Sequence, residues 1–199
     1  MSDASLRLPN FDAGRWRCGR FGCDDAIPGV VLSELNDFSA AAIIARNGKA
    51  ADVAAKLSAM IGTTVPDAQQ RAANAALSLT GIGPGQWLAV GYEGGDVADR
   101  LARDLAGLAS ISDQGSGRFI LHVSGPKARA ALSKGVPIDI DARIFKPGEA
   151  AQTVAGHIGI GLALLDATPR FELVSAVSTR GSLLAWLAAS AAEYGLEIR

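Results

Sequence analysis

Residues whose types could perform chemistry are few in this sequence. Ser124 follows His122 by two positions, but no G-x-S-x-G turn surrounds the serine to present it as a nucleophile. His122 and His157 both fall in expected strands, without a nearby carboxylate in sequence to orient them as bases. Asp139 and Asp141 share one side of an extended segment, where a metal or acid–base role and a solvated or capping role both stay open. We therefore predict no catalytic residue.

A glycine-rich stretch over residues 79–96 resembles a phosphate-binding loop at first sight. Gln86, however, occupies the position of the third glycine of G-x-G-x-x-G. The residues after it are aromatic and β-branched types that favour a strand, whereas a phosphate site needs the start of a helix. Pro84-Gly85 is typical of a tight turn. We therefore expect a β-hairpin and no cofactor bound by this chain.

Metal, membrane and nucleic-acid functions find no support in the composition. Cys18 and Cys23 lie far in sequence from both histidines, so we expect free thiols and no metal site. With 19 basic and 20 acidic residues, the chain has no excess charge to attract nucleic acid or an anionic membrane. Its apolar runs are shorter than the ~20 residues of a spanning helix, and no secretory signal is evident. We expect a cytoplasmic protein.

The strands and helices that would position a site are expected in the same order in both halves of the chain. Residues 39–115 predict a strand, a helix, two hairpin strands, a second helix and a last strand, the βαββαβ order of ferredoxin-like units. Residues 116–199 repeat the order more loosely, with an irregular bridge over 136–150. The helices carry apolar stripes that we expect to be buried, among them Leu101, Leu105, Leu183 and Leu187. No linker separates the halves, so we expect one compact unit.

Residues 1–38 have little periodicity and several turn formers, which indicates an extended N-terminal arm. Arg15, Trp16, Arg17 and Phe21 in this arm are of the residue types that most often anchor protein interfaces. We take them as candidates for a subunit interface. The alternative, that Trp16 packs into its own domain, stays open.

Several short motifs between residues 79 and 195 resemble, in their order and spacing, the gamma subunit of heterotetrameric sarcosine oxidase. The early hairpin "GPGQWLAV" is one of them. The others are Ser124-Gly125-Pro126, Ala128-Arg129, Leu132, Lys134-Gly135, Ile138-Asp139, Phe145, Gly148, Ala151, Thr153, Phe171, Arg180 and Trp186-Leu187.

This resemblance implies an α+β protein of two similar ferredoxin-like βαββαβ halves, as in the folate-binding aminomethyltransferase-like fold. It implies an accessory, non-catalytic subunit that works with alpha, beta and delta subunits. The complex would oxidatively demethylate sarcosine to glycine, with hydrogen peroxide and formaldehyde or methylenetetrahydrofolate as further products. Its FAD, FMN, NAD and tetrahydrofolate would be bound by the partners. Arg180 of the family's arginine–serine motif joins the interface candidates.

A stand-alone tetrahydrofolate-dependent one-carbon transferase or repair protein of the same superfamily is the alternative. Those relatives are marked by a K-G-C-Y-x-G-Q-E motif. The nearest stretch here, "FKPGEAAQT", lacks both the cysteine and the aromatic residue. The departure counts against folate chemistry by this chain alone.

Overall fold

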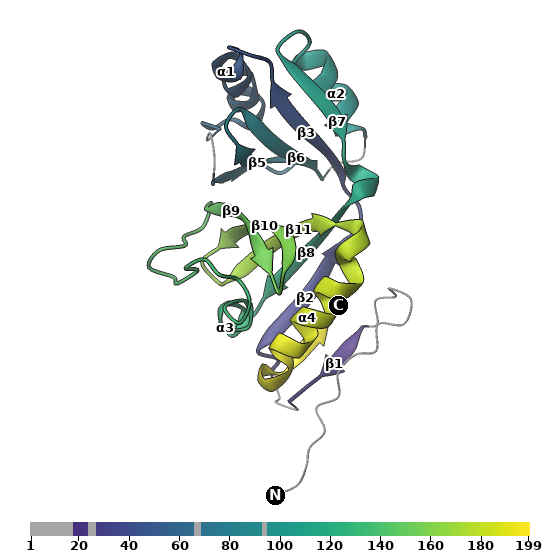
Figure 1. Cartoon of the computed structure of the whole chain (residues 1–199), viewed down its shortest axis with the longest axis vertical. Coiled ribbons are helices and arrows are strands. Elements are labelled where there is room, and N and C mark those ends of the chain that lie inside the picture. The colour runs from purple at the N-terminus through teal and green to yellow at the C-terminus, as the bar shows by residue number, and fades with distance from the viewer. Residues whose placement is uncertain (1–17, 24–26, 66–68, 93–94) are drawn as a thin grey trace, which may run out of the picture. The chain divides into compact units, whose positions relative to one another are not determined.

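A computed structural model describes residues 18–23, 27–65, 69–92 and 95–199 of the chain (Figure 1). Its contacts divide the chain into two units, which are described separately below. The first unit comprises residues 36–118 and 148–152. The second comprises the described residues up to 35, together with 119–147 and 153–199. The expectation that both halves pack as one compact unit stays a prediction.

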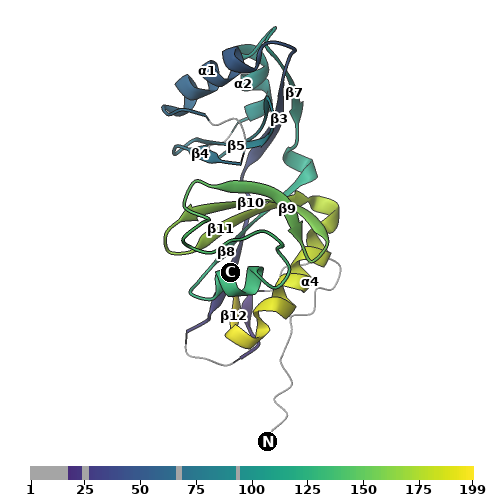
Figure 2. The same cartoon turned by 60° about the vertical axis from the view of Figure 1, so that its left-hand side comes forward.

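The first unit is one antiparallel sheet with both helices on one face (Figure 2). Its strand order, β4-β5-β6-β3-β7, contains the order of a ferredoxin-like βαββαβ unit, with β4 added at the edge. The predicted order of elements is therefore confirmed. The elements are β3 (Ser39–Ala45), α1 (Ala50–Ile61), β4 (Arg71–Ala73), β5 (Leu77–Gly83), β6 (Gln86–Gly91), α2 (Val97–Asp104) and β7 (Ala109–Asp113).

Local sequence explains most of this unit. Val53 and Leu57 of α1 are fully buried at helical spacing, and the helix ends at Gly62, whose φ of 77° closes it in the left-handed region. Asp96 caps α2, because its carboxylate accepts the backbone N–H of Ala98 at 2.8 Å. The glycine-rich stretch is the expected hairpin, β5 turning into β6.

The second unit is a seven-stranded sheet in the order β1-β12-β2-β8-β11-β10-β9. The helices α3 and α4 of this unit contact each other. Leu183 and Leu187 of α4 are fully buried, as the apolar stripe predicts. The elements are β1 (Gly19–Phe21), β2 (Val30–Leu35), β8 (Arg118–Ser124), α3 (Ala128–Leu132), β9 (Ala150–Ala155), β10 (Ile158–Asp166), β11 (Arg170–Ala176), α4 (Arg180–Ala191) and β12 (Leu196–Ile198), with short 3-10 turns at Val177–Thr179 and Ala192–Tyr194. A further 3-10 turn, Gly115–Gly117, belongs to the end of the first unit, before β8.

The prediction of an extended arm over residues 1–38 was wrong for its last part. β2 lies inside the sheet of the second unit, antiparallel to β8 and parallel to β12. Val30 and Leu32 are fully buried. A six-residue strand that follows a Pro-Gly turn gives too short an alternation to stand out in the sequence. The second half thus keeps its βαββαβ order with one extra strand between its helices, and its sheet also takes in β1 and β2 from the N-terminal segment.

Residues before β2 lie against the C-terminal end of the same unit. A Cβ on Gly29 would stand 2.4 Å from the carbonyl oxygen of Tyr194, and Gly29 donates its N–H to that oxygen at 2.8 Å. Only glycine allows this approach of two backbones. Gly29, one of the turn formers that indicated an extended arm, is therefore needed for close packing.

Candidate functional site

The predicted interface residues of the N-terminal segment have different outcomes. Arg15, Trp16 and Arg17 lie outside the described residues, so their role stays a prediction. Phe21 is half-buried in β1, where it pairs with Leu196 of β12. Its backbone therefore helps to hold the C-terminal strand, whatever its side chain contacts in an assembly.

Arg180, the fifth interface candidate, is the first residue of α4, and its side chain contacts residues of its own unit. Its Nη2 donates to Oε2 of Glu34 at 2.6 Å, and its guanidinium lies 5.4 Å from the ring centre of Phe119. The Arg180 side chain is 27% exposed and that of Glu34 16%. The pair ties α4 to β2 and β8. Its role at a subunit interface stays a prediction.

Arg129 of α3 has a comparable structural role. Its Nη1 donates to the backbone carbonyl of Ile140, and its guanidinium lies 5.1 Å from the ring centre of Phe171 in β11. The ring of Phe145 stacks on Phe171 at 6.4 Å. One arginine thus joins the helix, the irregular bridge and the sheet.

Lys134, just beyond α3, connects the C-terminal ends of two helices. Its Nζ donates to the backbone carbonyl of Ser190 at 2.5 Å, forms an ion pair with Glu193 and lies 4.6 Å from the ring centre of Tyr194. The hydrogen bond from Lys134 lowers the pKa of the Glu193 carboxyl below its ordinary value. The lysine is therefore occupied with holding α4 in place.

The side chain of Trp186, in α4, leaves no room for a side chain at Gly135. A Cβ on Gly135 would stand 2.5 Å from the indole Cζ2, and a Cβ on Gly156 would stand 2.4 Å from the indole Cδ1. The indole therefore lies directly on the backbone at both glycines. Like Arg129, Lys134 and Arg180, Trp186 is one of the residues that carry the sequence resemblance, and all four hold the second unit together.

The two histidines do not form a catalytic pair within this structure. His122 Nε2 lies 3.3 Å from Oε2 of Glu172 on a neighbouring strand, and the Glu172 side chain is only 2% exposed. The glutamate is 50 positions away in sequence, which is why no local pattern indicated it. The expectation that His157 lies in a strand was wrong: it occupies the two-residue Gly156-His157 turn between β9 and β10 with a φ of 74°.

Asp139 and Asp141 make local bonds in the irregular bridge. Asp139 Oδ1 accepts the N–H of Asp141 at 2.9 Å. Asp141 Oδ1 accepts both the N–H and the Nε of Arg143, and the side-chain bond lowers the pKa of Asp141 below its ordinary 3.8. These are turn-forming contacts of the kind that aspartate makes with its own backbone.

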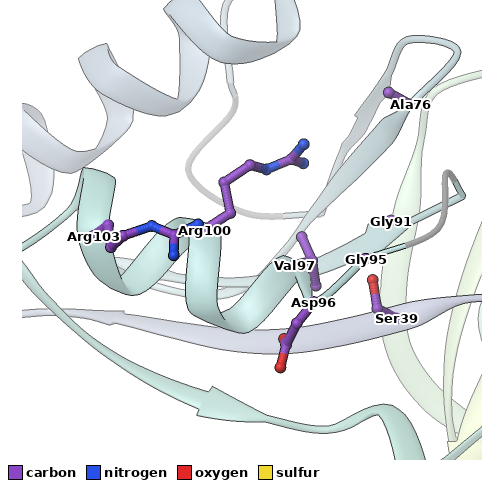
Figure 3. Close-up of a pocket in the computed structure, with 8 residues that line it drawn as sticks. All are labelled: Ser39, Ala76, Gly91, Gly95, Asp96, Val97, Arg100 and Arg103. Atoms are coloured by element: carbon purple, nitrogen blue, oxygen red, sulfur yellow. The ribbon is translucent and has the colours of Figure 1, made fainter.

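Each unit has a hollow on its described surface. In the first unit, a small polar pocket of about 230 Å³ lies beside the start of α2. Figure 3 shows Arg100 and Arg103 extending from that helix, with Ser39 across from them beside Gly95. In the second unit, an open groove of about 740 Å³ runs between α3 and the bridge.

Other kinds of site find no support in the part of the chain that the structure describes. No group of three or more His, Cys, Asp and Glu in these residues is placed to hold a metal ion. Cys18 and Cys23 are free, as expected. None of the helices described is long and apolar enough to cross a membrane.

Two units on the βαββαβ plan define the class of fold. The aminomethyltransferase T of the glycine cleavage system from Bartonella henselae shares it, with a TM-score of 0.62 at 14% identity over 86% of this chain and 48% of that chain. The predicted fold class, that of the folate-binding aminomethyltransferase-like proteins, is therefore confirmed.

The more specific similarity is to sarcosine oxidase. A chain of heterotetrameric sarcosine oxidase from Corynebacterium sp. U-96, in complex with pyrrole 2-carboxylate, aligns with a TM-score of 0.74 at 23% identity, covering 83% of this chain and 85% of that one. Sarcosine oxidase subunit gamma from Arthrobacter sp. is 31% identical over 134 residues, or 66% of this chain. The match spans 65% of that relative's length. No protein-family model matches the chain. These similarities confirm the resemblance seen in the sequence.

Proposed function

We propose that this chain is the accessory gamma subunit of a heterotetrameric sarcosine oxidase. The observation that carries the proposal is the 31% identity to a gamma subunit, which the fold alignment at a TM-score of 0.74 supports. The complex would oxidise sarcosine to glycine, with hydrogen peroxide and formaldehyde or methylenetetrahydrofolate as the other products. Its proposed location is the cytoplasm.

The structural use of the motif residues supports a non-catalytic role. Arg129, Lys134 and Arg180 each contact an aromatic ring and a second partner within the unit, and Trp186 packs on backbone. Side chains engaged in this way stabilise a scaffold, whereas a catalytic group must be able to reach a substrate. We propose that the alpha, beta and delta subunits supply the reaction and bind FAD, FMN, NAD and tetrahydrofolate.

Co-expression with the three candidate partners tests this function. An affinity-tagged chain should retain the other subunits through gel filtration, and the eluate should release hydrogen peroxide when sarcosine is added. The chain purified alone should be colourless and inactive, because no phosphate fingerprint or flavin-attachment context occurs in its sequence. A stoichiometric flavin spectrum in the pure chain would contradict the proposal, as would failure to retain any partner.

Calorimetry with tetrahydrofolate separates this function from the alternative of a stand-alone transferase. The fold is shared with an aminomethyltransferase, so it does not distinguish the two functions. An accessory subunit should show no heat of binding at micromolar protein. Tight one-to-one binding would favour the transferase.

The N-terminal residues Arg15, Trp16 and Arg17 are proposed to contact a partner subunit. Deletion of residues 1–17 tests this proposal, because it leaves β1 and its pairing with β12 in place. The shortened chain should fold with an unchanged melting temperature but should no longer be retained with the other subunits. Normal assembly of the shortened chain would show that the arm is not needed.

A further inference from the structure

The two cysteines of the sequence lie on either side of β1, the edge strand of the second sheet. Cys18 directly precedes Gly19, and Cys23 follows Phe21 by two positions. Both are exposed free thiols, and exposed thiols are the ones that an oxidant can reach. Thiol chemistry in this chain is therefore confined to one short segment.

The pairing of β1 with β12 keeps the two thiols apart. All of β1, from Gly19 to Phe21, is extended and antiparallel to β12. Beyond this strand, the N–H of Cys23 donates at 2.8 Å to the carbonyl oxygen of Ala192, which precedes β12. At about 3.3 Å per residue, the Cα atoms of Cys18 and Phe21 are already about 10 Å apart, and Cys23 lies further along. A disulfide needs Cα atoms within about 7 Å, so the paired strand excludes a bond between the thiols.

Few contacts hold β1 on the sheet. It is a strand of three residues at the edge, and Phe21 is only half-buried. The ion pair between Arg20 and Glu197 spans 3.7 Å, and the Arg20 side chain is 58% exposed. Short edge elements of this kind open locally without unfolding of the whole protein. Gly19 and Gly22 lie between the two cysteines, so the released segment has the backbone freedom to bring the thiols together.

We infer that Cys18 and Cys23 are a peroxide-sensitive thiol pair, in which hydrogen peroxide forms a disulfide that holds β1 away from β12. In the cytoplasm, thiols are kept reduced, and the disulfides that do form there are usually transient or redox-sensing. Hydrogen peroxide is a product of the oxidase reaction proposed above, so the inference rests on the proposed function for the source of its oxidant. Because the disulfide and the paired strand exclude each other, oxidation removes the edge strand from the second sheet.

The oxidation balances with one molecule of hydrogen peroxide. One thiolate attacks a peroxide oxygen, the O–O bond breaks, and a sulfenic acid and hydroxide form. When β1 opens, the second thiolate attacks the sulfenic sulfur, the S–S bond forms and a second hydroxide leaves. The two thiols give up two electrons and two protons, and the peroxide is reduced to two molecules of water.

Mass spectrometry of the full chain treated with hydrogen peroxide tests the thiol pair. The treated chain should lose both free thiols and the mass of two hydrogen atoms, and dithiothreitol should reverse both changes. Trypsin cuts after Arg20, between the cysteines, so the digest should contain the Cys18 fragment joined to the Cys23 fragment. Cys18→Ser and Cys23→Ser should each abolish the joined fragment. In the assembled complex, sarcosine should produce the same disulfide, and catalase should prevent it.

Amide hydrogen exchange shows whether β1 leaves β12. Oxidation should raise the exchange rate of β12 amides by about tenfold or more and leave that of β5, in the first unit, unchanged. Glu197→Gln removes the charge opposite Arg20, so it should speed disulfide formation by about twofold or more. Asp166→Asn is the matched control, because it removes the charge opposite Arg170 in an exposed pair of the same unit, on strands away from β1. The control should leave the rate of disulfide formation unchanged.

Other results overturn the inference in ways that can be told apart. Oxidation of the thiols to separate sulfinic acids, or a disulfide between two chains, would show that the two cysteines are not a pair. A disulfide with unchanged exchange in β12 would show that β1 is not displaced. If the complex releases peroxide from sarcosine but forms no disulfide, the inference is wrong while the proposed function stands. If the pure chain forms the disulfide with added peroxide but retains no other subunit, the proposed function fails while the thiol pair stands.

Discussion

The two units share one plan of strands and helices but are held together by different kinds of contact. In the first unit, the core is built by apolar residues that recur along two helices and the strands beside them, such as Leu57 and Leu101. In the second unit, part-buried polar contacts also join residues far apart in the chain, whereas the comparable contact of the first unit, from Lys56 Nζ to the backbone carbonyl of Asp104, is exposed. Arg180 and Glu34 are 146 positions apart, and Lys134 and Ser190 are 56 apart.

This difference shows that one plan can be stabilised in two ways. In the first unit, β4, β5 and β6 pair with their neighbours in sequence, and only the central strand β3 pairs with later strands, β6 and β7. The second unit takes in β2 from near the N-terminus, so its sheet forms only when distant segments meet. We therefore expect core truncations to be equally harmful in both units and changes at specific contacts to be harmful mainly in the second.

Core truncation should have the largest effect and should not distinguish the units. Leu101 and Leu183 are fully buried, one in each unit. Leu101→Ala and Leu183→Ala should each lower the free energy of unfolding by about 2–5 kcal/mol, measured by urea denaturation. Ala189→Ser, on the exposed side of α4, is the control and should change it by less than about 0.5 kcal/mol. A small effect from either leucine would show that its site is not a packed core.

A methyl group beneath Trp186 should have the next largest effect. Gly135→Ala should destabilise the chain by about 1–3 kcal/mol, because the new Cβ overlaps the indole and the adjacent backbone of Gly156. Gly159→Ala is the matched control, since nothing lies within 4 Å of its Cβ position. Equal stability of the two variants would mean that the tryptophan side chain can move aside.

Removal of the negative charge from the ion pair between Arg180 and Glu34 should lower the free energy of unfolding by less. Glu34→Gln keeps a hydrogen-bond acceptor for Arg180 but removes the charge, so it should cost about 1 kcal/mol. The corresponding change in the first unit is Asp52→Asn, which breaks the exposed pair with Lys49 and should cost less than about 0.5 kcal/mol. If both changes cost the same in thermal unfolding, the proposed contrast between the units does not hold.

The smallest effect concerns the titration of Asp141 in the bridge. Its pKa is lowered in the folded chain, chiefly by the hydrogen bond from Arg143, so the stabilisation is present above the unfolded value of about 3.8 and is lost as pH falls through the folded pKa. NMR titration of the carboxyl carbon should show a value below 3.8, and Arg143→Gln should raise it. An unchanged pKa in the variant would show that the bond is not maintained in solution.

What the sequence by itself determined is the set of elements and the faces that they bury. The spacing of Leu101 and Leu105, the cap at Asp96 and the turn at Pro84-Gly85 all act over a few residues, so each can be recognised locally. The same is true of the βαββαβ order. A resemblance to known gamma subunits could also be recognised, because it depends on the order of short motifs.

Only the tertiary structure decided where β2 pairs and what the motif residues contact. Glu34 was part of a predicted loose arm, yet it is the partner of Arg180. Lys127 and Asp139 are twelve positions apart with nothing in the sequence to connect them, yet both line the groove beside α3. Local propensity gives no information about which distant segments will meet. That is decided by the burial of β2 between β12 and β8, which brings these residues to their partners.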